Sequence, residues 1–160
     1  MPERTFPFVP KSTRFMQPGD FWAIPLADGS FGCGLVIQLA PKSLPSGSRA
    51  FLGALSSWHG GSPPTADSLA GHRCLEQGVM HILAITRSGG AILGNRPLAA
   101  DRIKPWVFAD GPKSFTRGFT PVHPFRLPRH RPLGWWGPDV ISIYAHRHLL
   151  GSVPGEADDG

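Results

Sequence analysis

Histidine and cysteine are the side chains in this chain that could ligate a metal or act as nucleophiles. The 160 residues include seven histidines and two cysteines. His146 and His148 would share one face of a strand, but a zinc site needs three or four converging ligands, and no Cys-x-x-Cys or His-Glu-x-x-His spacing occurs. Cys33 lies among glycines and is expected to pack. Cys74 follows Gly-His-Arg, and these basic neighbours could lower the pKa of its thiol.

The carboxylates and glycine-rich segments also lack a catalytic pattern. Asp20 is expected to accept main-chain hydrogen bonds at the start of a strand, and Asp28 to form a turn. The glycines near residues 32 and 89 do not form a phosphate loop, because no following helix carries the required lysine. We therefore predict that the protein is not an enzyme and that it holds no cofactor and no metal.

A basic and aromatic strip in the C-terminal third is the clearest candidate for recognition. Arginine neutralises phosphates and tryptophan stacks on bases, as in proteins that bind single strands. The same side chains also dominate the binding energy of protein interfaces. The sequence does not separate these two interpretations, and the candidate partner-binding residues are Arg126, Arg129, Arg131, Trp135 and Trp136.

The positive charge is concentrated in the same part of the chain. The net charge is +5, and residues 102–150 contain eight Lys or Arg against two Asp. Such a surface can meet nucleic acid, anionic lipid or an acidic protein, or it can simply keep the protein soluble.

Short strands must position these side chains, because 20 glycines and 18 prolines disfavour long helices. Alternating or apolar segments predict strands over residues 21–26, 31–39, 50–57 and 79–85, with a last strand over 140–144. The predicted fold class is mostly β: a single domain with a strongly bent antiparallel sheet or half-barrel and short helices.

The expected organisation is an N-terminal arm over residues 1–17, one β-rich domain over 18–150 and a disordered acidic tail over 151–160. Within the domain, residues 112–138 form a segment rich in Pro and Arg that is expected to be extended. The first residues contain no apolar signal sequence, and no segment approaches the roughly 20 apolar residues of a membrane span. We therefore expect a cytoplasmic protein with reduced cysteines that does not bind membranes.

One segment is more specific than a hairpin requires. It contains an Asp-Gly turn, the strongest short hairpin signal, followed by glycines with a period of two that leave one face of the return strand bare. The residues that make up this pattern are Gly19, Asp20, Phe21, Ile24, Pro25, Leu26, Asp28, Gly29, Phe31, Gly32, Gly34 and Val36.

This segment resembles the opening hairpin of the immunity protein 26 family of bacterial polymorphic toxin systems, and the resemblance covers roughly residues 17–100. It implies an immunity protein that neutralises a cognate toxin by tight, non-catalytic binding. The alternative is a nucleic-acid-binding or phage-derived adaptor module that uses the basic, Trp-containing strip. Because an inhibitor that mimics nucleic acid should be acidic, the charge of +5 disfavours a nuclease blocked in this way.

Overall fold

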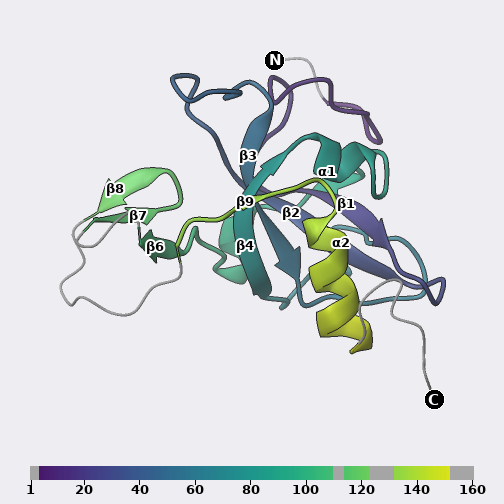
Figure 1. The fold of residues 1–160 in the computed structure, drawn as a ribbon. Coiled ribbons are helices and arrows are strands. Elements are labelled where there is room, and N and C mark those ends of the chain that lie inside the picture. Colours follow the sequence, from purple (N-terminus) through teal and green to yellow (C-terminus); the bar gives the residue numbers. More distant parts are fainter. Residues whose placement is uncertain (1–3, 110–113, 123–131, 152–160) are drawn as a thin grey trace.

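A six-stranded sheet is the centre of the computed structural model, which describes residues 4–109, 114–122 and 132–151. The strand order is β5-β1-β2-β3-β4-β9, and a three-stranded sheet of order β6-β7-β8 projects to one side (Figure 1). The strands of the larger sheet are β1 Asp20–Pro25, β2 Phe31–Leu39, β3 Ala50–Ser56, β4 Cys74–His81, β5 Gly94–Asn95 and β9 Trp135–Trp136. Those of the smaller sheet are β6 Val107–Ala109, β7 Phe115–Arg117 and β8 Thr120–Val122.

The helices are short, as the glycine and proline content predicts. They are α1 Leu83–Thr86, the 3₁₀ turn η1 Leu98–Asp101, α2 Val140–Ala145 and the π-helical turn η2 His146–Leu150, which continues α2. The mostly β fold with short helices is confirmed. One strand departs from the antiparallel expectation, because β9 pairs with β4 in parallel.

The β1–β2 hairpin forms as the sequence predicts. The Asp28 carboxylate accepts the Ser30 N–H at 2.9 Å, and Gly29 has a φ of +85°, which an L-residue with a side chain rarely adopts. Trp22 pairs with Gly34 across the two strands. This register places an indole ring over a residue with no side chain.

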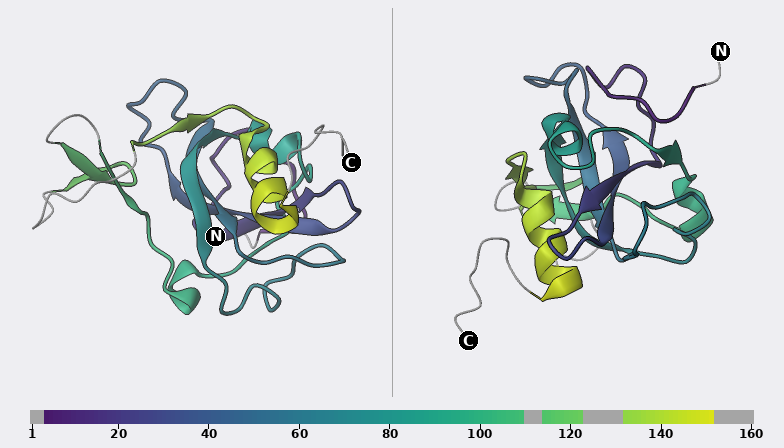
Figure 2. Two further views of the ribbon diagram at one scale, coloured as in Figure 1. Left: turned by 60° about the horizontal axis from the view of Figure 1, so that its bottom comes forward. Right: turned by 90° about the vertical axis from the view of Figure 1, so that its right-hand side faces the viewer.

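The core has two parts, one on each face of the larger sheet. Trp22, Phe51 and Met80 belong to the first, which α2 covers through Ile141 and Ala145. Figure 2 shows α2 lying beside the strands. The second part contains Leu52 and Phe108 and extends under the segment that leads to β6.

Two expected strands are wrong. Residues 140–144 form helix α2, in which Ile141 and Ala145 are buried four positions apart and so lie on one helical face. Residues 79–85 are not one strand either, because β4 ends at His81 and α1 begins at Leu83. The strand begins at Cys74, earlier than expected, and its polar residues Glu76 and Gln77 are buried with hydrogen-bond partners.

The described residues of the N-terminal arm and of the Pro/Arg-rich segment also contact the sheet. Phe8 of the predicted arm pairs with Ile92, and the guanidinium of Arg4 lies 2.7 Å from the Asp20 carboxylate. In the Pro/Arg-rich segment, β7, β8 and β9 form, whereas residues 112–113 and 123–131 and the tail from 152 lie outside the described residues. No helix within the described part of the chain is long and apolar enough to cross a membrane.

Candidate binding surface

The side chains of the β1–β2 hairpin are engaged in packing and in local hydrogen bonds. An added Cβ at Gly34 would lie 2.3 Å from the Trp22 ring, and one at Gly32 would lie 2.9 Å from Leu149. The Asp20 carboxylate accepts the Gln17 N–H at 2.9 Å, as predicted for a strand start. These positions therefore build the fold and present little chemistry to a partner.

The two cysteines are free, and burial keeps both thiols protonated. Burial raises the pKa of Cys33 well above its ordinary value, and it raises the pKa of Cys74 to about 11. The expectation that the basic residues before Cys74 lower its pKa is wrong, because desolvation by burial raises this pKa and outweighs the opposing effect of a hydrogen bond with Gln77.

The histidines are also held in ways that differ from a metal site. His146 and His148 lie in η2 rather than on a strand face. His146 Nε2 accepts the Ala27 N–H at 3.0 Å, and its Nδ1 lies 2.7 Å from the Ser142 carbonyl oxygen, so the hairpin turn is tied to α2. Among the described residues, no group of three or more His, Cys, Asp or Glu side chains could hold a metal ion.

A serine, a histidine and an aspartate do meet at the hairpin turn. Ser30 Oγ hydrogen-bonds to Asp28 and lies 2.7 Å from His59 Nε2. The hydrogen bonds from Ser30 lower the pKa of the Asp28 carboxyl. In a catalytic triad the carboxylate orients the histidine, whereas here it binds the serine, so the cluster is a turn cap.

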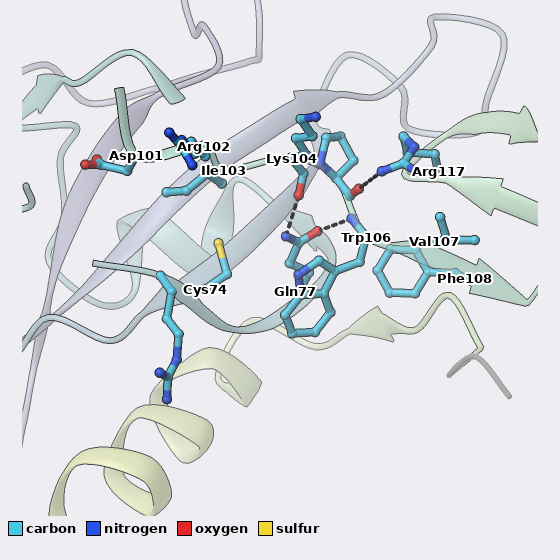
Figure 3. A pocket seen from close by; sticks show the side chains of 12 residues that line it. Cys74, Gln77, Asp101, Arg102, Ile103, Lys104, Trp106, Val107, Phe108 and Arg117 are labelled. Carbon is cyan, nitrogen blue, oxygen red and sulfur yellow. Dashed lines mark hydrogen bonds between the residues drawn. The ribbon is translucent and has the colours of Figure 1, made fainter. Parts of the chain in front are cut away.

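A groove lies between β4 and the segment that leads into β6. It has a volume of about 690 Å³ and is called here the cationic groove. Figure 3 shows Gln77 and Cys74 beside the facing segment, with Arg117 of β7 at one end. Its lining comprises Arg73, Cys74, Gln77, residues 101–108 and Arg117.

A glutamine side chain holds this groove open. Gln77 Oε1 accepts the Trp106 N–H at 2.8 Å, and its Nε2 donates to the Lys104 carbonyl at 3.0 Å (Figure 3). A side chain thus takes the place of direct strand pairing, so the 104–106 backbone lies one side chain away from β4. Gln38 of β2 does the same for the β7–β8 turn, because its Oε1 accepts the Phe119 N–H at 2.9 Å.

Four exposed cations line the groove, and its one carboxylate is already paired. The Asp101 carboxylate binds the Arg96 guanidinium at 2.7 Å and accepts the Gly71 N–H at 2.9 Å. The Arg96 guanidinium holds the pKa of Asp101 below its ordinary value. Within the described residues, no carboxylate forms an ion pair with any of the four cations, Arg73, Arg102, Lys104 and Arg117.

The predicted recognition strip is described only at its end. Trp135 is 59% exposed, whereas Trp136 is half-buried against Tyr144, with ring centroids 4.9 Å apart. Trp135 pairs with Val79, so both project on the sheet face that also carries Gln77 and the groove. Arg126, Arg129 and Arg131 lie outside the described residues.

Sequence reasoning missed the groove itself. The charge excess over residues 102–150 indicated three of its cations, but nothing in the local pattern located them beside β4. Gln77 and Trp106 are far apart in sequence, and only the fold brings them together.

Comparisons with known proteins do not indicate a family or a function for this chain. No protein-family model matches the chain, and neither a curated protein nor a solved structure matches it.

Proposed function

We propose that this chain is an immunity protein that neutralises a cognate bacterial toxin by tight, non-catalytic binding. The resemblance of the β1–β2 hairpin to the immunity protein 26 family motivates the proposal. The free cysteines are consistent with an intracellular role, since their thiols are buried and protonated.

The exposed Trp135 is the observation that supports partner binding most directly. An indole that is 59% exposed on a short edge strand offers a large apolar area to a partner. Its backbone is held by the pairing of β9 with β4, so little conformational freedom remains to be lost on binding. Tryptophan is among the residues that most often dominate interface energies.

The test begins with capture from the native cell. The tagged full chain is used as bait, captured proteins are identified by mass spectrometry, and each is expressed alone and together with this chain. We expect one captured protein to stop growth alone and to be harmless in the presence of this chain. Trp135→Ala should bind that protein at least about tenfold more weakly, or roughly 1.4 kcal/mol, with an unchanged melting temperature.

Phe15→Ala is the matched control, because Phe15 is an aromatic residue that is 63% exposed on the N-terminal arm. Its affinity should equal that of the wild type. If none of the captured proteins is toxic, or if co-expression relieves no toxicity, the immunity function is wrong.

The cationic groove supports a second candidate, a nucleic-acid-binding module. Four exposed cations around one cavity are a suitable surface for phosphates. This alternative predicts that nucleic acid co-purifies with the protein, giving a high ratio of absorbance at 260 to that at 280 nm, and that added salt removes it.

A further inference from the structure

We propose that the cationic groove binds an acidic peptide segment of the partner protein in which carboxylates alternate with apolar side chains. This inference rests on the proposed function, because it names the chemistry of the partner's contact segment. Three properties of the groove support it: its backbone is already hydrogen-bonded, its rim is positively charged and its floor is apolar.

The backbone of the outer wall has few groups left to pair with an added strand. Gln77 binds the Lys104 carbonyl and the Trp106 N–H, and the Arg117 guanidinium donates to the Pro105 carbonyl at 3.2 Å. The Trp106 carbonyl accepts the Gly118 N–H at 2.9 Å. A ligand in the groove must therefore be recognised mainly by side chains rather than by strand addition.

The rim selects a negatively charged ligand. Arg102 and Lys104 are exposed on the outer wall, and Arg73 and Arg117 are exposed at its ends. The Arg96 guanidinium already neutralises Asp101, which also accepts the Gly71 N–H, so this carboxylate does little to offset the positive potential. Carboxylates placed opposite these cations would relieve their mutual repulsion and gain complementary charge.

The floor distinguishes a peptide from a nucleic acid. It is formed by Ile103, Val107, the buried Phe108 and the protonated thiol of Cys74. Apolar side chains of a peptide would bury against this floor. Single-stranded nucleic acid gains affinity by stacking on exposed rings. The aromatic residues among the described lining are the half-buried Trp106 and the buried Phe108, which pack in one core cluster, and the exposed Trp135 does not line the groove.

Probes of defined chemistry test this assignment without the toxin. A peptide that alternates Glu with Leu, a poly-Glu peptide of equal charge and a thymidine oligonucleotide of equal charge are each titrated into the ¹⁵N-labelled full chain and followed by NMR. We expect the Glu-Leu peptide to bind most tightly. It should shift the resonances of the Gln77 side-chain amide and the Trp106 main-chain N–H, which belong to the hydrogen-bonded bridge in the groove.

Charge reversal gives the second measurement. Arg102→Glu with Lys104→Glu should weaken binding of the Glu-Leu peptide at least about tenfold. The control, Lys42→Glu with Arg49→Glu, lowers the net charge equally at exposed positions of the β2–β3 loop and should change the affinity less than about twofold. Should the reversed variant misfold, Arg102→Gln with Lys104→Gln removes the same charges more gently and should weaken binding in the same direction.

Three results overturn the inference: tighter binding of the oligonucleotide than of the peptide, peptide shifts that avoid Gln77 and Trp106, or equal weakening by the control variant. Each leaves the toxin assay unaffected, so failure of the groove assignment and failure of the immunity function are separate outcomes. A toxin that is neutralised equally well by the reversed variant would also place the docking site elsewhere.

Discussion

The β1–β2 hairpin and the cationic groove are held together by different means. In the hairpin, main-chain pairing runs from Phe21 with Leu35 to Pro25 with Phe31, and packing of the Trp22 ring fills the bare face of Gly34. In the groove, the side chain of Gln77 bridges two segments that do not pair. The first arrangement buries most of the two strands and leaves the turn exposed, whereas the second leaves a cavity lined by charge.

The difference separates the part of the chain that builds the fold from the part that forms the candidate binding surface. The hairpin residues on which the proposed resemblance rests are occupied by packing and turn formation. The exposed cations and Trp135 all follow this hairpin along the chain. Arg73 comes first, just before β4.

The largest expected effect is at Gly34. Gly34→Val would place a Cβ about 2.3 Å from two atoms of the Trp22 ring, and both strands are fixed by pairing, so neither can yield cheaply. We expect a loss of about 3 kcal/mol or more in the free energy of unfolding, at the upper end for overpacked cores. Urea denaturation and soluble yield measure it.

Gly61→Val is the control for Gly34→Val, because no atom lies within 4 Å of a Cβ added at Gly61. It should change stability by less than about 0.5 kcal/mol. If Gly34→Val melts like the wild type, the hairpin is not held by this contact.

A smaller effect is expected at Gln77. Gln77→Leu keeps the approximate side-chain volume but removes the partners of the Trp106 N–H and the Lys104 carbonyl. The loss should be about 1–3 kcal/mol, the range for leaving such groups unsatisfied. Hydrogen exchange of the Trp106 amide should become faster, which overpacking at Gly34 would not cause selectively.

Gln17→Leu is a suitable comparison for Gln77→Leu, since the Gln17 side chain is exposed. It should leave both stability and the exchange of the Trp106 amide unchanged. An equal rate of exchange in Gln77→Leu and the wild type would mean that other contacts keep the groove open.

The sequence predicts the hairpin well because its determinants are local. Asp28 and Gly29 define the turn, and the spacing of Gly32 and Gly34 defines the bare face. Helix α2 is missed because Val140, Ile141 and Ile143 are β-branched and favour a strand in isolation. The buried face formed by Ile141 and Ala145 against the first core cluster outweighs that preference.

The sequence predicts the residue types of the candidate site but not its position in the fold. The excess of Lys and Arg after residue 101 indicates a cationic surface. If the strip binds a partner protein, Trp135 or Trp136 should be partly exposed beside Arg129 or Arg131; Trp135 is 59% exposed, and the two arginines lie outside the described residues. The position of the groove depends on the contact between Gln77 and Trp106, which links distant parts of the chain. A glutamine within a strand carries no local signal that distinguishes a bridging role from an exposed one.

The smallest expected effect concerns the paired carboxylate at the edge of the groove. Asp101→Asn keeps the shape of the side chain but removes the charge that binds the Arg96 guanidinium. We expect a modest loss of stability at neutral pH, smaller than that of Gln77→Leu, because the asparagine oxygen can still accept the Gly71 N–H and a hydrogen bond from Arg96, so that only the charge is lost. Affinity for the Glu-Leu peptide should rise slightly, because one negative charge is removed from the groove lining.

The stability that the ion pair of Asp101 and Arg96 contributes should depend on pH. Because the pKa of Asp101 is lowered in the folded protein, its ion pair contributes stability that is fully present above the pKa of the unfolded chain, near 3.8. That contribution is lost as the pH falls through the lower pKa of the folded state. The difference in stability between the wild type and Asp101→Asn, measured by urea denaturation from pH 7 downward, should therefore shrink in acid.

Asp139→Asn provides the reference, because the exposed Asp139 side chain makes no capping hydrogen bond to α2. A difference for Asp101→Asn that persists at the acid end would show that the variant loses packing or hydrogen bonds rather than charge.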